Sequence, residues 1–306
     1  MKLSVVINTK NAEKTLEASL KSVKFADEII VVDMMSTDDT VKIAKKFTTS
    51  IFAHDDVGYV EPARNFAISK AMSDWILILD ADEEVPQELA KVIKGILKSD
   101  EKGQATADCY YVPRRNMIFG KWIEKTGWWP DHVLRLFKKG HVEWSDQIHS
   151  IPITSGKVHE LSAVKEIAII HHNFQHVDQY IDRMNKYSSI QAEEISNAED
   201  LELDSKFIFR KFASELLSRL FAQRGINDGS HGLSLSLLQA ISEASVAMKV
   251  WDEKGFPETN REQEEELMEE ISQFKKELAY WIADWHVENN VGVNKLLWQV
   301  RRKLYI

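Results

Sequence analysis

One apolar run that ends in two closely spaced acids constrains this chain more than any other feature. Residues Trp75–Leu79 carry no charge, and Asp80 and Asp82 follow directly. Such a run is typical of a buried strand in a parallel sheet, and open α/β sheets bind their ligands at the carboxyl ends of such strands. Two carboxylates at that edge suit a divalent cation, which in turn would hold a diphosphate. The alternative is a solvated turn after the strand.

The amino-terminal part of the chain repeats a strand and a helix several times. Expected strands cover 3–11, 28–33, 50–53 and 75–80, and expected helices cover 12–23, 36–47, 62–72 and the segment after Pro86. Asn11 and the pair Ser36 and Asp39 have the positions of helix caps. Because right-handed crossovers join such units, we expect a Rossmann-like, mostly parallel α/β sheet flanked by helices, with Asp33 and Asp80 at its carboxyl edge.

Composition argues against several classes of protein. The 306 residues are 44% hydrophobic and carry a formal net charge of −9, which indicates a real core and argues against a broad nucleic-acid footprint. The one cysteine, Cys109, lies in an apolar run, so we expect a buried thiol in a reducing compartment. With no leader-like start and no apolar run of membrane length, we expect a cytoplasmic protein. Motifs of zinc hydrolases and P-loop enzymes are missing from the sequence.

Six short segments, in this order along the chain, resemble one protein family. They are SVVINTKN, EIIVVDMMSTDDT, EPARNFAI, DWILILDADEE, YYVPRRNMIFGKWI and GWWPDHVLRLFKKG. Together they resemble family 2 nucleotide-sugar glycosyltransferases of the A-type fold, in the bacterial branch that includes lipopolysaccharide core glucosyltransferases. The resemblance covers residues 1 to about 250, and the ordered series is more specific than any one segment.

The resemblance implies a set of donor-binding residues. It implies that Thr9, Lys10 and Asn11 line the nucleotide pocket, that Asp33 accepts hydrogen bonds from the base or ribose of a UDP-sugar, and that Arg64 and Asn65 lie near the diphosphate and sugar. It further implies that Asp80 contacts the sugar or ribose, and that Asp82 binds a divalent cation, Mn or Mg. His149 and His171 are candidates for a further metal ligand. Asp33 could instead cap the next helix, and Arg64 could instead pair with Glu61 or Asp55.

A glycosyl transfer also needs a base, and the resemblance implies that Asp131 takes this role. In the same way it implies that Trp128, Trp129 and Arg135 bind the acceptor. Arg135 could instead orient Asp131, or Asp131 could simply pair with Arg135 in a turn after Pro130. Arg114 and Arg115 are further candidates for phosphate contacts. Glu83 and Glu84 are expected to be solvated charges at a helix start.

The later part of the chain has helical spacing. Expected helices cover 178–198, 207–223, 233–251 and 261–285, before a short basic tail. We therefore expect a nucleotide-sugar-binding half at 1–115, an acceptor-binding half of the same catalytic domain at 116–175, and a helical region at 176–306. The helical region could cover the sheet, form a homo-oligomer, or touch a membrane through Trp281, Trp285, Leu297 and Trp298 with the basic tail Arg301–Lys303.

These observations predict a metal-dependent, inverting glycosyltransferase. The expected donor is a nucleotide-diphospho-sugar, and the expected acceptor is a cell-envelope glycan such as lipopolysaccharide core, a lipid-linked glycan, or another acceptor at the inner face of the plasma membrane. A catalytically silent nucleotide-sugar-binding or assembly subunit is one alternative, against which the set Asp33, Asp80, Asp82 and Asp131 counts. A sugar nucleotidyltransferase is another, but its Gly-rich, Arg-containing loop does not follow the first strand.

Overall fold

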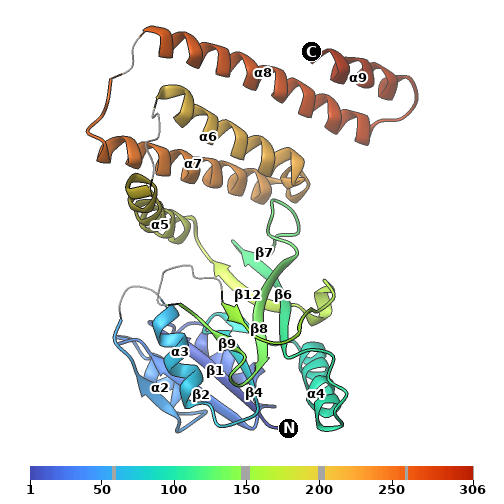
Figure 1. Cartoon of the computed structure of the whole chain (residues 1–306). Helices are drawn as coiled ribbons and strands as arrows, with labels where there is room; N and C mark the ends of the chain where they lie inside the picture. Colours follow the sequence, from blue (N-terminus) through green and yellow to red (C-terminus); the bar gives the residue numbers. More distant parts are fainter. Residues whose placement is uncertain (57–59, 146–151, 199–203, 259–260, 306) are drawn as a thin grey trace. The chain divides into compact units, whose positions relative to one another are not determined.

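The computed structural model describes residues 1–306 except 57–59, 146–151, 199–203, 259–260 and 306 (Figure 1). The chain divides into two compact units. Unit 1 comprises residues 1–117 and 129–173, and unit 2 comprises residues 118–128 and 174–306. Each unit is described by itself below.

Unit 1 is built on a sheet whose strands follow the order β3-β2-β1-β4-β8-β6-β12-β5. The first four of these are parallel: β3 (Ile51–Ala53), β2 (Glu28–Asp33), β1 (Leu3–Thr9) and β4 (Trp75–Asp80). Their register pairs Thr9 with Asp33 and Asn8 with Asp80. The predicted parallel arrangement is therefore confirmed, and both acids end their strands at the carboxyl edge.

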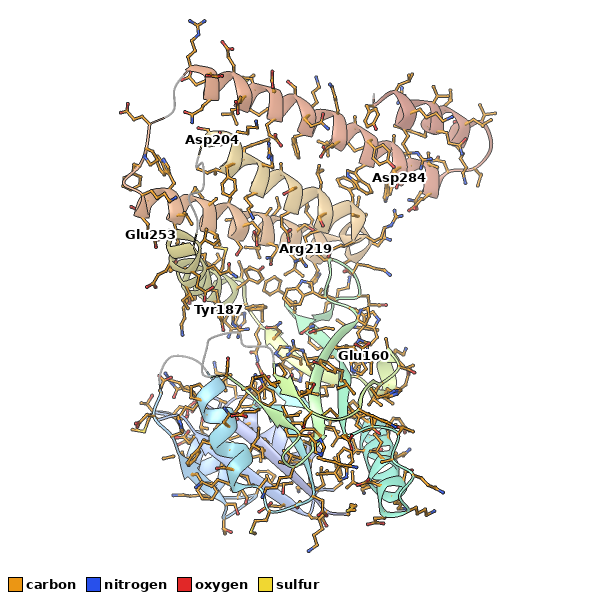
Figure 2. All side chains as sticks on the ribbon, viewed as in Figure 1. Glu160, Tyr187, Asp204, Arg219, Glu253 and Asp284 are labelled. Carbon is orange, nitrogen blue, oxygen red and sulfur yellow. The ribbon has the colours of Figure 1, made fainter. Side chains whose placement is uncertain are left out.

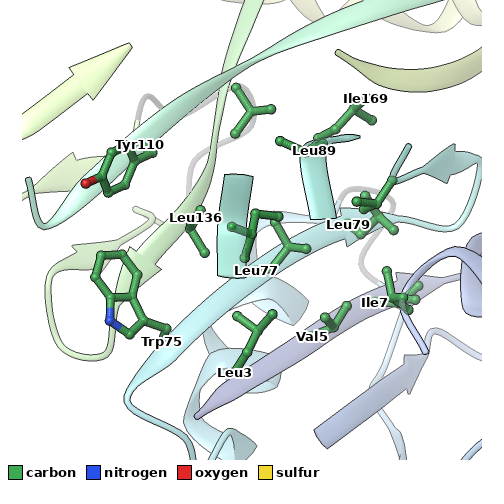
Figure 3. Close-up of a cluster of buried hydrophobic side chains, with 14 of the residues drawn as sticks. Leu3, Val5, Ile7, Trp75, Leu77, Leu79, Leu89, Tyr110, Leu136 and Ile169 are labelled. Atoms are coloured by element: carbon green, nitrogen blue, oxygen red, sulfur yellow. The ribbon is translucent and has the colours of Figure 1, made fainter. Parts of the chain in front are cut away.

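Helices cover both faces of the parallel strands. Leu3, Val5, Ile7, Trp75, Leu77 and Leu79 point to the face covered by α1 (Leu16–Ser22), α2 (Thr40–Ala44) and α4 (Gln87–Glu101), and Figure 3 shows this cluster. Val6, Ile30, Val32, Ile76 and Ile78 point to the opposite face, where α3 (Glu61–Lys70) presents Ala63, Ala67 and Ala71. Because side chains alternate along a strand, burial on both faces requires the uninterrupted apolar runs seen in the sequence.

The expected helix caps are wrong. Asn11 lies outside α1 with φ 47°, and its Oδ1 accepts a hydrogen bond from the Thr37 backbone N–H at 2.8 Å. The Ser36 hydroxyl receives the Asn11 N–H at 2.8 Å, and Asp39 makes no side-chain cap. These side chains instead join the loops after β1 and β2, so the polar groups that follow two parallel strands are held together.

The sheet continues with antiparallel strands. β8 (Asp131–Lys138) runs antiparallel to both β4 and β6 (Cys109–Ile118), and β12 (Ile169–Phe174) runs antiparallel to β5 (Glu83–Glu84). The short elements of this region are β9 (Val142–Glu143), β10 (Ile153–Thr154), β11 (Val158–Glu160) and the 3₁₀ helix η1 (Lys165–Ile167). Pairing of His171 with Glu83 brings a segment from late in the chain beside the acids that follow β4.

Unit 2 is largely helical. Its elements are β7 (Lys121–Trp122), α5 (Val177–Ala198), α6 (Ser205–Leu217), the π-helical turn η2 (Ser218–Ala222), η3 (Gly225–Asp228), α7 (Ser230–Glu253), α8 (Arg261–Asn289) and α9 (Gly292–Leu304). α7 packs against α5 and α6, and α8 packs against α6 and α9. The expected helices are confirmed, and the expected short tail is the helix α9. Among the described residues, the helices lack the length and apolarity needed to cross a bilayer.

The loop between β7 and Trp128 is fixed inside unit 2 by a buried acid. Asp228 accepts hydrogen bonds from the Lys125 backbone N–H at 2.9 Å and from the Thr126 hydroxyl at 3.4 Å, and its own carbonyl accepts the Lys121 ammonium at 2.9 Å. A Cβ on Gly232 would lie 1.8 Å from the Gly225 carbonyl oxygen, so only glycine allows this close approach. The segment at Arg224–Gly229 is therefore structural.

Candidate active site

The ends of β1 and β2 present buried hydrogen-bond acceptors without partners. Thr9 and Asp33 are paired in register, and their exposed fractions are 3% and 7%. Asp33 Oδ2 accepts the Ser36 N–H at 3.1 Å, whereas Asp33 Oδ1 and Thr9 Oγ1 have no hydrogen-bond partner among the described residues. Because a buried carboxylate oxygen without a donor is costly, this edge suits a ligand that supplies hydroxyl or N–H donors, such as a nucleoside.

The neighbouring residues of the predicted nucleotide pocket lie in the same loops. Asn11 joins the two loops through Thr37, and the exposed Lys10 ammonium forms an ion pair with Asp56. Lys10 therefore needs to leave Asp56 before it can meet a phosphate. The structure brings Thr9, Asn11 and Asp33 together, and their roles toward a donor stay predictions.

Asp80 is surrounded by arginines. Arg64, on α3, reaches Asp80 Oδ1 at 3.3 Å, and Arg135, on β8, forms an ion pair with Asp80 Oδ2. Burial alone would raise the pKa of Asp80, but the charges of Arg135, Arg64 and Arg114 outweigh it and hold this pKa well below its usual range. Asp80 is therefore a fixed carboxylate. The alternative that Arg64 pairs only with Asp55 or Glu61 receives no support from this geometry.

Glu83 was expected to be solvated, and this expectation is wrong. Its exposed fraction is 0%, and its Oε1 accepts hydrogen bonds from Arg135 Nη2 at 2.7 Å and Arg114 Nη1 at 3.2 Å. Its Oε2 accepts the Asp80 backbone N–H at 3.1 Å. The reason is that the chain after Asp80 does not enter a helix: it forms β5, which pairs with β12 in the sheet. Glu83 thereby adds a carboxylate that balances the charges of Arg114 and Arg135.

Arg135 also departs from its predicted role. It is 3% exposed, and burial would lower its pKa, but Asp80 and Glu83 raise it above the usual range of a guanidinium. Its guanidinium meets these two carboxylates and not Asp131, so the predicted pairing with Asp131 is wrong. Arg135 positions Asp80 and Glu83, and its contact with an acceptor stays a prediction.

Asp131 takes its partners from β6. Arg114 donates to Asp131 Oδ2 from Nε at 2.9 Å and from Nη2 at 2.8 Å, and Asn116 Nδ2 donates to the same oxygen at 2.8 Å. Oδ1 accepts no hydrogen bond from the residues that the structure describes, and the side chain is 26% exposed. One oxygen thus anchors the carboxylate, and the role of the other toward an acceptor hydroxyl stays a prediction. The alternative, a purely structural role for Asp131, would rest on its ion pair with Arg114.

Asp82 and His171 face each other. His171 Nε2 lies 3.6 Å from Asp82 Oδ2, and the His172 backbone N–H holds the Asp82 carbonyl at 2.9 Å. His171 Nδ1 lies 2.7 Å from Asn116 Oδ1. Because Asn116 gives its amide group to Asp131, its carbonyl oxygen faces His171, so Nδ1 donates to Asn116 and Nε2 is the ring nitrogen that faces Asp82.

This donor set fits a hard divalent cation. A carboxylate and an imidazole whose second nitrogen is held by another side chain are ordinary metal ligands, and Mg²⁺ and Mn²⁺ take further oxygens from phosphates and water. The described residues contain no cluster of three acidic, histidine or cysteine ligands, and Asp82 and His171 are the pair that could hold a cation. His149 lies outside the described residues. His172 pairs with Glu84 at 2.6 Å.

The remaining predicted residues are distributed differently. Asn65 exchanges two hydrogen bonds with the Trp144 backbone, at 2.7 Å and 3.0 Å, so its amide holds the residue after β9, and its role toward a donor sugar stays a prediction. Trp129 is half-buried in unit 1, two residues before Asp131. Trp128 belongs to unit 2, where it packs edge-on against Phe174 with ring centroids 6.5 Å apart. Roles of both tryptophans toward an acceptor stay predictions.

Two residues were missed from the sequence: Glu83 as a buried ion-pair partner and Asn116 as a link. Asn116 stands two positions after Arg114, so strand alternation could have placed both on one face of β6, opposite Asp131. His171 was a candidate metal ligand from the sequence, but no local signal indicated that β12 would bring it to Asn116. Cys109 behaves as expected: burial raises the pKa of its thiol to about 11, which disfavours a nucleophilic thiolate.

The chain is similar to several known proteins. Residues 4–157 match the family described as Glycosyl transferase family 2. An uncharacterized glycosyltransferase of Rickettsia typhi is 30% identical over 256 residues, which cover 79% of this chain and 84% of the relative. The lipopolysaccharide core biosynthesis glycosyltransferase LpsC of Rhizobium meliloti is 24% identical over 203 residues, 63% of this chain and 71% of LpsC. A structure of S. aureus TarS 1-349 in complex with UDP-GlcNAc is 14% identical with a TM-score of 0.41, covering 100% of this chain and 89% of that one.

Proposed function

Because the chain belongs to glycosyl transferase family 2, we propose that it moves a sugar from a UDP-sugar to a hydroxyl of a lipid-linked, cell-envelope glycan, with inversion at the anomeric carbon. The observation that carries the proposal is one connected set of side chains, Asp131–Asn116–His171–Asp82. Through Asn116, this set connects the carboxylate of Asp131, which has one oxygen without a hydrogen bond from the described residues, to Asp82 and His171, two side chains of the kinds that bind metals.

Each residue of the set takes a role in the transfer. Asp131 Oδ1 accepts the proton of the acceptor hydroxyl while the acceptor oxygen attacks the anomeric carbon from the side opposite the diphosphate. The bond from that carbon to the diphosphate oxygen breaks, and UDP leaves. Asp82 and His171 would hold a Mg²⁺ or Mn²⁺ ion, which when bound offsets the charge of the departing diphosphate. Asp33 and Thr9 accept hydrogen bonds from the uridine.

The arginines keep the acids in place. Arg114 and Asn116 fix Asp131 Oδ2, which directs Oδ1 outward, and Arg135 holds Asp80 as an anion beside the predicted sugar position. Such an arrangement lowers the cost of ordering the reacting groups in the transition state. A lipid-linked acceptor at the inner face of the plasma membrane is part of the same proposal, and the name of LpsC, a lipopolysaccharide core biosynthesis glycosyltransferase, supports lipopolysaccharide core as the glycan.

The proposal is tested first by measuring which nucleotide-sugar donor the protein binds and cleaves. A panel of nucleotide sugars with UDP, GDP, ADP and CMP leaving groups is screened by thermal shift with Mn²⁺ present, since a ligand that binds the folded state raises Tm. We expect UDP-sugars to stabilise the protein and to release UDP slowly in the presence of a cell-envelope extract. If no nucleotide sugar raises Tm or releases its nucleotide, the proposed activity is excluded.

A further inference from the structure

The helix α9 has one face that is already packed. Trp298 stacks on His286 of α8 with ring centroids 3.9 Å apart and an interplanar angle of 9°, and Arg302 forms an ion pair with Asp284 at 2.6 Å. Asp284 is labelled in Figure 2, where α9 lies along the end of α8. Tyr305, just past the helix, lies 5.8 Å from Tyr280 by ring centroids. α8 therefore covers the side of α9 that carries Trp298 and Arg302.

The opposite face of α9 is apolar and exposed. The side chains concerned are Val293, Leu296, Leu297, Val300 and Leu304, which we call the α9 stripe, and their exposed fractions run from 55% to 72%. Their spacing of three and four residues places them in one row along the helix. A row of exposed aliphatic side chains on a packed helix marks an interaction surface.

Charge indicates what the stripe meets. Residues 290–306 contain Lys295, Arg301, Arg302 and Lys303 and no acidic residue, although the whole chain is acidic. At about 100° per residue, Arg301 and Lys303 lie on either side of the stripe, and both are exposed. The acidic run of α8, from Glu262 to Glu270, lies on the far half of that helix, since α9 contacts residues 280–286.

We propose that α9 docks on the surface of an anionic lipid membrane, with the α9 stripe in the acyl boundary and Arg301 and Lys303 at the headgroups. An apolar face flanked by cations is the arrangement of helices that lie in the interface plane. A second copy of the chain fits less well, because two stripes facing each other would bring Arg301 and Lys303 against their own copies.

The apolar residues of the proposed membrane contact differ from those expected from the sequence. Trp281 stacks on Phe221 with centroids 6.2 Å apart, and Trp298 stacks on His286, so both rings are already packed within unit 2. Trp285 is half-buried and packs edge-on against His286 with centroids 4.9 Å apart, so of the expected apolar set Leu297 remains exposed. The inference does not depend on sugar transfer: a membrane-bound chain without activity would leave it intact.

The test is flotation of the full chain with vesicles, at low and at high salt. One set of vesicles is phosphatidylcholine, and the other is phosphatidylcholine mixed with phosphatidylglycerol. We expect the chain to float with the anionic vesicles at low salt and to be released by high salt, because exposed charges are then screened. Replacing Arg301 or Lys303 by glutamine should weaken partitioning about fivefold each, the factor that corresponds to one cation near an anionic surface.

Matched variants locate the contact. Leu297→Glu adds an acid to the stripe and should abolish flotation, whereas Met268→Glu, which changes a 60% exposed residue on α8, should float like the original. Both variants should keep the Tm and the affinity for UDP of the original protein.

Three results would overturn the inference. The chain could stay at the bottom of the gradient with both kinds of vesicle, it could float equally with neutral ones, or Met268→Glu could lose flotation as completely as Leu297→Glu. A dimer in solution that Leu297→Glu converts to a monomer would assign the stripe to a second copy instead.

Discussion

Two regions of the same sheet edge carry acids in opposite states. At the ends of β1 and β2, Asp33 Oδ1 and Thr9 Oγ1 are buried with no partner among the described residues. Around β4, β6 and β8, Asp80, Glu83 and Asp131 each accept from at least one arginine. Since an unpaired buried acceptor costs free energy and a paired one is held in place, the second region is arranged beforehand, and we propose that a ligand completes the first.

The largest expected effect is on turnover in the second region. Asp131→Asn keeps the shape of the side chain and, only in part, the hydrogen bonds that Oδ2 accepts, but it removes the basic carboxylate. Loss of a general base costs about 10²–10⁴-fold in rate. Rates of UDP release should fall by this factor while the Kd for UDP-sugar is unchanged. Asp108→Asn is the control, because Asp108 pairs with Lys138 near the start of β6. Near-normal turnover would transfer the role to another acid, with Glu143 the next to change.

The second effect is on stability. Glu83→Ala leaves Arg114 and Arg135 buried with one carboxylate fewer, and breaking a buried ion pair costs about 3–5 kcal/mol in unfolding free energy. Glu84→Ala, which breaks the half-buried pair with His172, should cost about 1 kcal/mol or less. Urea unfolding followed by tryptophan fluorescence measures both. Equal losses would mean that the second region is not held by its ion pairs.

The two regions also differ in how far the sequence predicts them. The parallel strands and the positions of Asp33 and Asp80 followed from local signals, because apolar runs and strand ends depend on neighbouring residues. The partners of Asp80 did not, because Arg135, Glu83 and His171 reach it through antiparallel pairings between distant segments. A solvated Glu83 was the natural expectation for an acid after a strand, and only the short strand β5 reverses it.

Helical packing shows the same limit in unit 2. The spacing of apolar residues predicted the helices, but it could not distinguish Trp298, which α8 covers, from Leu297, which is 59% exposed. Adjacent residues on one helix point to different sides, and which side is covered depends on the neighbouring helix.

A third effect concerns the first region. Asp33→Asn removes the charge of a buried carboxylate and should weaken UDP binding about tenfold to a hundredfold, the range for one hydrogen bond to a charged group. Unfolding free energy should stay the same or rise, because an unpaired buried charge is lost. Calorimetric titration with UDP measures the affinity. Asp38→Ala, which removes the acceptor for the Thr40 N–H at 3.0 Å, should lower stability and leave the affinity unchanged. The reverse pattern would contradict the assignment.

The smallest effect is a dependence on pH. Burial opposes ionisation of Asp80, but Arg135, Arg64 and Arg114 lower its pKa below that of an unfolded aspartate, so its ion pairs stabilise the fold above about pH 4 and are lost as pH falls toward the folded-state pKa. Unfolding free energy should therefore fall less steeply below about pH 4 in Asp80→Asn than in the original protein. Identical acid profiles would show that Asp80 is not held ionised by the arginines.

The central claim is that Asp82 and His171 hold the cation on which donor binding depends. Calorimetric titration of UDP with and without Mn²⁺ tests it on the original protein, on His171→Ala and on His172→Ala, each checked for an unchanged fold by circular dichroism. We predict that Mn²⁺ raises UDP affinity in the original protein and in His172→Ala, and that His171→Ala loses most of this gain, by about tenfold or more. A full gain in His171→Ala, or an equal loss in both variants, would contradict the account.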